Sequence, residues 1–241
     1  KVLDLCGWIN PLRHFPNAAS DHATLHRRPF MFLSKLVLDP RHPLARRDLG
    51  DAYEMHRTLV RAFVPNEFSP PQRFLWRLER PTDSQHVGRC SNVVLVQSAQ
   101  EADWSILDLQ PGYAEEVFPN KEVDLRTLIK HGASYRFRLL ANPTVTRAGK
   151  RYGLAREEEQ LVWIARQGER HGFSVLGCVR AADARLQLSQ GSSGNRITVH
   201  TALFEGVLQV VNAEALREGV LKGLGHTKAL GLGLLSLAKL A

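Results

Sequence analysis

The order in which strand-like and helix-like hydrophobic patterns follow one another most strongly limits the folds open to this chain. Residues 31–38 (MFLSKLVL) place Phe32, Leu36 and Leu38 on one face, which is typical of a strand in a sheet whose second face is partly covered. The next patterned segments are a helix and two strands, at 52–63, 73–79 and 92–98. The first half therefore begins as a β-α-β-β unit.

The second half of the chain repeats this order. A strand-like segment at 134–140 precedes a helical segment at 156–170, whose acidic start and basic end suit the helix dipole. Further strands are expected at 173–179, 185–190, 197–204 and 207–211, followed by a helix beginning near Asn212 and a last apolar segment at 232–237. Two β-α-β-β-α-β units in tandem are the simplest α+β architecture that fits.

The first 30 residues are patterned differently from the rest. Prolines interrupt any helix there, and no apolar alternation marks a strand. His14, His22 and His26 lack acidic or cysteine partners at a spacing known for metal ligands, so we expect no metal site. We expect 1–30 to be a tail or the remnant of an upstream sequence, 31–120 an N-terminal domain, and 121–241 a C-terminal domain.

The chain carries a clear excess of positive charge. Its 32 Lys and Arg against 24 Asp and Glu give a formal net charge of +8. Residues 1–30 hold four Lys or Arg and two Asp, so +6 of this charge belongs to the following residues. Such a field attracts a polyanion, either a nucleic acid or an anionic membrane surface, and the charge alone does not choose between them.

Several classes of protein are not expected. No stretch approaches the roughly 20 consecutive apolar residues of a membrane-spanning helix, and polar residues interrupt the apolar start that resembles a signal peptide. We therefore expect a cytoplasmic protein without membrane association. Cys6, Cys90 and Cys178 are far apart and odd in number, so neither a disulfide framework nor a cysteine zinc site is expected.

The predicted helix at 52–63 carries a group of side chains suited to proton transfer. Tyr53, His56 and Arg57 fall on one face, whereas the opposite, core-facing stripe contains Met55, Leu59, Ala62 and Phe63. On a phosphodiester, His56 would move a proton near neutral pH, Tyr53 would donate a hydrogen bond, and Arg57 or Arg61 would neutralise developing charge. The alternative is a half-exposed helix surface without function.

A cluster of glycines lies near the C-terminus, at positions 219, 223, 225, 231 and 233. It fits neither a Walker A loop nor a dinucleotide fingerprint, because Gly-Lys-Ser/Thr is absent and position 228 is Lys. We expect a loop between a helix and the final strand that lets backbone amides, His226, Thr227 and Lys228 approach an anion. The alternative is a flexible turn with glycines for tight packing.

Three segments of the chain resemble the CasE family, the CRISPR RNA-processing endoribonucleases of the type I-E Cascade complex. These segments are MFLSKLVLDPRHPLARRDLGDAYEMHRTL, ALFEG and GHTKALGLGLLSLA. The resemblance runs from Met31 to the end and implies that Met31 is the natural initiator. It implies two tandem ferredoxin-like, RRM-related domains, in agreement with the repeated pattern of strands and helices.

The resemblance also implies an activity and partners. Members of the family cut the repeat hairpin of precursor CRISPR RNA at the 3′ base of its stem, without metal or cofactor. The 2′-hydroxyl attacks the adjacent phosphate and leaves a 2′,3′-cyclic phosphate and a 5′-hydroxyl. The enzyme then stays on the crRNA hairpin beside the Cascade backbone subunits and the 5′-handle subunit, and meets target DNA only through the assembled complex.

By resemblance, His56 and Tyr53 are the catalytic pair, with the acid and base roles left open, and Arg61 holds the scissile phosphate in place of a lysine. Candidates for gripping the RNA backbone are Arg46, Arg47, Arg57, Arg147, Lys150, Arg151, Arg185, Arg196, Gly225 and Lys228. The family's basic hairpin corresponds here to 189–196, which is mostly neutral and departs from the pattern. A catalytically inactive subunit that only holds the hairpin is the alternative.

Aromatic side chains are expected to serve packing rather than RNA stacking. Tyr135 and Phe137 alternate with arginines in a strand and are interpreted as core residues. Trp76, Trp104 and Trp163 are likewise interpreted as packing residues.

Overall fold

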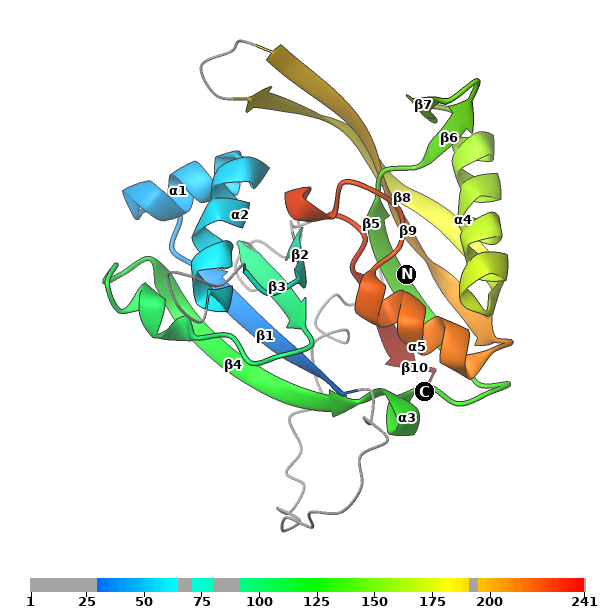
Figure 1. The fold of residues 1–241 in the computed structure, drawn as a ribbon, viewed down its shortest axis with the longest axis horizontal. Helices are drawn as coiled ribbons and strands as arrows, with labels where there is room; N and C mark the ends of the chain where they lie inside the picture. The colour runs from blue at the N-terminus through cyan, green and yellow to red at the C-terminus, as the bar shows by residue number, and fades with distance from the viewer. Residues whose placement is uncertain (1–29, 65–70, 80–91, 191–194, 241) are drawn as a thin grey trace.

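The computed structural model describes residues 30–64, 71–79, 92–190 and 195–240, with no description of the side chains of 187–197. It contains two four-stranded antiparallel sheets, in the orders β2-β3-β1-β4 and β10-β5-β9-β8 (Figure 1). In each unit the first strand pairs with the third and the fourth, which is the ferredoxin-like order. The predicted α+β class with tandem ferredoxin-like units is confirmed. The predicted tail lies almost entirely outside the described residues.

The first sheet and its helices come from the first half of the chain. Its elements are β1 (Phe30–Leu38), α1 (Pro43–Gly50), α2 (Ala52–Val60), the 3-10 turn η2 (Arg61–Phe63), β2 (Phe74–Glu79), β3 (Val93–Ser98), the 3-10 turn η4 (Trp104–Leu107) and β4 (Ala114–Asp124). The turn η4 takes the place of the second helix of the unit. Helix α1 was not predicted; Pro43 occupies its first turn, where the missing N–H of proline costs no helical hydrogen bond.

The second unit carries an inserted hairpin. Its elements are α3 (Leu125–Leu128), β5 (Ser134–Ala141), β6 (Thr144–Arg147), β7 (Lys150–Gly153), α4 (Glu157–His171), β8 (Phe173–Gln190), β9 (Asn195–Val210), α5 (Ala213–Lys222), the 3-10 turn η6 (Lys228–Leu230) and β10 (Leu235–Lys239). The prediction of four separate strands between 173 and 211 is wrong, because β8 and β9 run through both gaps. Two register shifts in β8 absorb the irregular pattern.

Each sheet buries one face against its own helices. In the first unit Leu36 and Leu38 of β1 pack with the predicted helix stripe, whose members Met55, Leu59, Ala62 and Phe63 are all buried. In the second unit Tyr135 and Phe137 are buried core residues, as predicted. The buried faces of the helix at 52–63 and of the strand at 134–140 were therefore predicted correctly, because the period of each fixes which side chains share a face.

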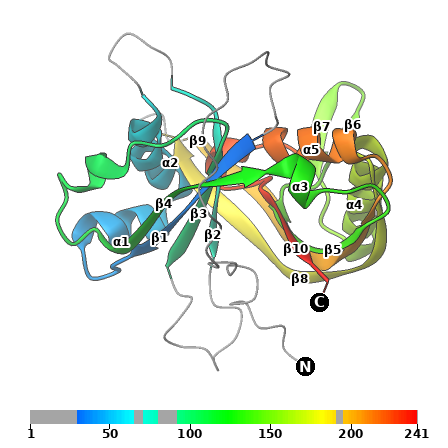
Figure 2. The same ribbon diagram turned by 90° about the horizontal axis from the view of Figure 1, so that it is seen from below.

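The opposite faces of the two sheets meet across a buried group of charges. Arg77 and Glu79 of β2 lie beside Arg138 of β5, and Arg138 also pairs with Glu205 of β9 at 2.9 Å. These four side chains are at most 15% exposed. Figure 2 shows the two units side by side, with α1 and α2 at one end and α4 at the other. No described helix is long and apolar enough to cross a membrane.

Candidate active site and nucleic-acid interface

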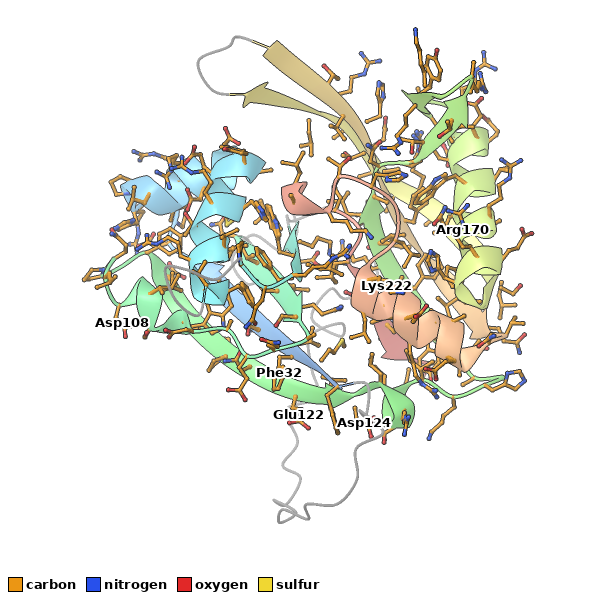
Figure 3. The ribbon with its side chains drawn as sticks, in the orientation of Figure 1. Phe32, Asp108, Glu122, Asp124, Arg170 and Lys222 are labelled. Atoms are coloured by element: carbon orange, nitrogen blue, oxygen red, sulfur yellow. The ribbon has the colours of Figure 1, made fainter. Side chains whose placement is uncertain are left out.

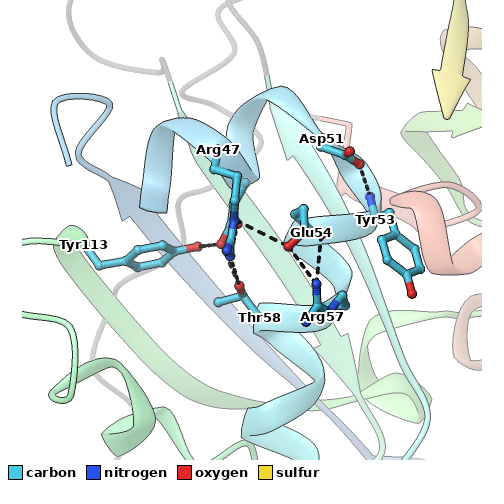
Figure 4. A network of polar contacts seen from close by, with 8 residues as sticks. Arg47, Asp51, Tyr53, Glu54, Arg57, Thr58 and Tyr113 are labelled. Carbon is cyan, nitrogen blue, oxygen red and sulfur yellow. Dashed lines mark hydrogen bonds and ion pairs between the residues drawn. The ribbon is translucent and has the colours of Figure 1, made fainter. Parts of the chain in front are cut away.

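Helix α2 presents its polar face outward because its opposite face is fixed in the core. Asp51 caps the helix, since its carboxylate accepts a hydrogen bond from the backbone N–H of Tyr53 at 2.8 Å. The phenol of Tyr53 is 49% exposed, and Figure 4 shows it directed away from the neighbouring polar network. Arg57 is exposed and pairs with Glu54 one turn earlier at 2.9 Å.

His56 lies half-buried beside β2. Its ring stacks on Phe74, with ring centroids 5.3 Å apart and planes at 24°. Within the described part of the chain no group hydrogen-bonds its buried Nδ1 atom. Burial lowers the pKa of His56, because a charged imidazolium loses hydration there. At neutral pH the ring is therefore mainly neutral and able to accept a proton.

A buried carboxylate fixes the angle between α1 and α2. Asp48 accepts hydrogen bonds from Arg47 Nε at 2.8 Å, Thr58 Oγ1 at 2.6 Å and Tyr113 Oη at 2.7 Å (Figure 4). Burial and the Asp48 carboxylate raise the pKa of Tyr113, so its phenol remains a donor. The Asp48 carboxylate is bound inside this network, so Asp51 alone caps α2.

Arg61 lies on a different side of the helix from His56. Five residues after His56, it is turned by about 140° around an ideal helix. It lines a cavity of about 130 Å³ together with Leu44, Thr58, Ile106 and Tyr113. The structure thus brings Tyr53, His56 and Arg57 onto one exposed surface, and it does not bring Arg61 to that surface.

The glycine-rich loop of the second unit packs beside this helix. It connects α5 to β10, as predicted, and its turn η6 contacts both α2 and β2 (Figure 1). Gly223, Gly225, Gly231 and Gly233 all have φ between +71° and +87°, where a Cβ is strained. A loop from one unit and a helix from the other therefore share one site.

Cations gather at this loop. Lys228 Nζ donates to the Lys222 carbonyl at 2.7 Å, and Arg73 donates to the same oxygen at 3.4 Å. Burial and the neighbouring Arg73 lower the pKa of Lys228. Burial also lowers the pKa of His226, and so does the positive charge of Arg151. The remaining N–H groups of these side chains can donate hydrogen bonds to an anion.

Arg73 and Arg170 were missed from the sequence. Arg170, at the end of α4, contributes positive charge at His226, and Figure 3 shows it on the side of the molecule that also carries Lys222. In the sequence each belongs to a predicted strand or helix, and neither carries a motif that marks it for RNA binding. The signal that joins them to the loop is tertiary, because Arg73, just before β2, and Arg170, in α4, are far from the loop in sequence.

The remaining predicted RNA-binding residues are spread over several elements. Arg147, Lys150 and Arg151 are exposed on the β6–β7 hairpin, in which regular pairing joins 144–147 to 150–153. The other predicted residues are exposed Arg46 and Arg47 on α1 and exposed Arg185 on β8, whereas the side chain of Arg196 lies outside the described residues. Among the described residues no cluster of His, Cys, Asp and Glu could hold a metal ion.

The fold and the site together define a tandem ferredoxin-like protein with a tyrosine and a histidine on a helix of one unit and a cationic glycine-rich loop from the other. A sequence model of the family described as "CRISPR associated protein" matches residues 31–239. The chain therefore belongs to the CRISPR-associated protein family, and it is an endoribonuclease of the Cse3 and CasE type.

Two relatives and one solved structure illustrate this similarity. The CRISPR-associated endoribonuclease Cse3 of Thermus thermophilus is 40% identical over 220 residues, which are 86% of this chain and all of the relative. The CRISPR system Cascade subunit CasE of Escherichia coli is 30% identical over 223 residues, 87% of this chain and all of the relative. A structure of Cse3 bound to a 19-nucleotide RNA has a TM-score of 0.76 and 42% identity, covering 87% of this chain and 99% of that one.

Proposed function

We propose that this chain cleaves the repeat hairpins of precursor CRISPR RNA without a metal ion and remains bound to the 3′ hairpin of the product. The observation that carries the proposal is the position of Tyr53 and His56 on α2, a helix that contacts the glycine-rich loop of the second unit. The similarity to a structure of Cse3 with bound RNA supports RNA as the substrate.

The proposed reaction is an attack by the 2′-hydroxyl on the adjacent phosphorus. A bond forms from the 2′-oxygen to phosphorus, the bond from phosphorus to the 5′-oxygen breaks, and a 2′,3′-cyclic phosphate and a 5′-hydroxyl result. The 2′-hydroxyl must lose a proton and the leaving 5′-oxygen must gain one. The lowered pKa of His56 favours the base role for this side chain.

The other side chains then have complementary roles. Tyr53 is the exposed hydroxyl on the same helix face and would hydrogen-bond the reacting oxygens or share the proton transfer. Arg57 would neutralise charge that develops on the phosphate, and it would leave its surface pair with Glu54 to do so. Arg61 would supply positive charge from the side of the helix that faces the cavity.

We propose that the basic side chains grip the RNA stem mainly through its phosphates. Base edges of A-form RNA lie in a deep, narrow groove, so proteins grip such stems by backbone and shape. The residues proposed for this role are Arg46, Arg47, Arg57, Arg147, Lys150, Arg151, Arg185, Arg196, Gly225 and Lys228. A relative named as a Cascade subunit supports assembly with other Cascade subunits. We propose that this assembly acts in the cytoplasm and that this chain meets target DNA only through it.

Cleavage of a repeat hairpin in EDTA tests the proposal. The protein is incubated with the CRISPR repeat RNA of its own genome, either native or with a 2′-deoxy sugar at the scissile position. We expect cleavage of the native RNA, and binding without cleavage of the deoxy RNA. Loss of cutting in EDTA would contradict the metal-free reaction, and cutting of the deoxy RNA would contradict 2′-hydroxyl attack. Tight binding of native RNA without cutting under any condition would instead identify a structural hairpin-binding subunit.

A further inference from the structure

Strand β2 contacts both halves of the site. The ring of Phe74 stacks on His56, at 5.3 Å between centroids. Two residues further along, the indole N–H of Trp76 donates to the carbonyl of Ala229 in the glycine-rich loop at 3.1 Å. Phe74 and Trp76 share one face of the strand, about 6.6 Å apart along it, because side chains repeat every two residues.

Both ends of the glycine-rich loop lie close against the same strand. A Cβ on Gly231 would come within 3.0 Å of the Trp76 ring, and a Cβ on Gly223 within 2.8 Å of Leu75. The loop backbone therefore reaches β2 only because these positions lack side chains. Trp76 is 2% exposed, so its contact with the loop is buried.

We propose that Trp76 is a positioning residue that fixes the glycine-rich loop at a set separation from His56, an inference that rests on the function proposed above. Trp76 acts through the loop and is itself too buried to contact RNA. Every residue of β2 pairs with β3, so the backbone of the strand sets the spacing between its two contacts. A displacement of about 1 Å between reacting groups can slow an enzyme about 100-fold.

Replacing Trp76 by Phe tests the contact with Ala229. Trp76→Phe keeps an aromatic ring in the core but removes the N–H donor, so the loop loses its hydrogen bond. Tyr135→Phe is the matched control, because the buried Tyr135 hydroxyl also donates to a backbone carbonyl, that of Leu128, in another part of the molecule. Both variants are measured where circular dichroism shows them fully folded.

The readout separates binding from chemistry. Single-turnover cleavage is measured at saturating hairpin RNA, and affinity is measured with the 2′-deoxy RNA. We expect Trp76→Phe to slow cleavage by about 10- to 100-fold while its Kd changes by less than about 3-fold. Tyr135→Phe is expected to cleave within about 2-fold of the parent rate, because its lost bond lies outside the path from His56 to the loop.

A pair of glycine variants tests the same contact from the loop side. Gly231→Ala places a methyl group 3.0 Å from the Trp76 ring at a φ of +77°. Gly132→Ala imposes nearly the same strain, at a φ of +75°, with no atom within 4 Å. We expect Gly231→Ala to slow cleavage as Trp76→Phe does, and Gly132→Ala to leave the rate close to that of the parent.

Two results would overturn the inference. One is parental cleavage by Trp76→Phe, and the other is an equal loss of rate in Trp76→Phe and Tyr135→Phe, which would reflect stability alone. Failure of the proposed function is distinguishable from both, because the parent protein itself would then fail to cleave the native RNA.

Discussion

At the scale of single residues, the chemistry of His56 follows from the side chain packed against its ring. The Phe74 ring covers one face of the imidazole, and Nδ1 is buried. Adding a proton would place a charge where hydration is poor, so the pKa of His56 lies below the ordinary histidine value of about 6.5. Tyr53 and Arg57, by contrast, remain in contact with solvent.

This environment predicts the pH dependence of cleavage. As pH falls through the lowered pKa of His56, the ring gains a proton and can no longer act as the base, so the rate falls. We expect the acid limb of the single-turnover rate, measured at subsaturating RNA, to have its midpoint below about 6.5. A rate that rises as pH falls through this range would contradict the base role and assign His56 as the acid.

The side chains of the helix face could be predicted from sequence, and their surroundings could not. A period of 3.6 residues is enough to group Tyr53, His56 and Arg57, because the helix geometry fixes which side chains share a face. The stacking partner Phe74 and the loop carbonyl of Ala229 come from segments distant in sequence. No local pattern encodes those contacts, and Trp76 was interpreted only as a packing residue.

At the scale of elements, the position of α2 depends on the buried Asp48 network with Arg47, Thr58 and Tyr113. It ties α1 to α2 and to the loop before β4. The elements themselves were largely predictable, since strand and helix periods differ. Local patterns did not locate α1, whose first residue is a proline, α3, or β4, whose residues are mostly exposed. They also missed the β6–β7 hairpin, whose charged residues show no apolar alternation, and the continuity of β8 and β9.

Substituting Asp48 tests the energetic importance of this network. Asp48→Asn removes the charge that strengthens three hydrogen bonds and presents an N–H group to neighbouring donors. We expect the free energy of unfolding in urea to fall by about 2–3 kcal/mol. Glu218→Gln, which weakens an exposed pair with Lys222, should change it by less than about 0.5 kcal/mol. Equal effects of the two variants would contradict a structural role for Asp48.

At the scale of the whole molecule, the site exists only because the two units are held in one orientation. The sequence predicted two repeated units but not how their sheets meet. In the sequence Arg138 alternates with core residues, and no partner was predicted for it. In the structure it is buried between Glu79 and Glu205. The division at residue 120 stays a prediction; the first sheet ends at Asp124 and the second begins at Ser134.

Breaking this charge group should destabilise the protein more than breaking an exposed one. Arg138→Met leaves the Glu205 carboxylate without its buried partner, and we expect a loss of about 3–5 kcal/mol in denaturant unfolding. Arg180→Met removes a pair with Glu157 that is partly exposed, and we expect a loss below about 1 kcal/mol. A loss below about 1 kcal/mol for Arg138→Met would show that the cluster does not hold the units together.

The cleavage rate of His56→Ala tests most directly whether His56 transfers a proton in the reaction. We expect a single-turnover rate at least about 100-fold below that of the parent, because proton transfer by a positioned group contributes about that much or more. Binding of the 2′-deoxy hairpin should change little, and the exposed His131→Ala control should cleave like the parent. Cleavage by His56→Ala at the parental rate would contradict a catalytic role for His56.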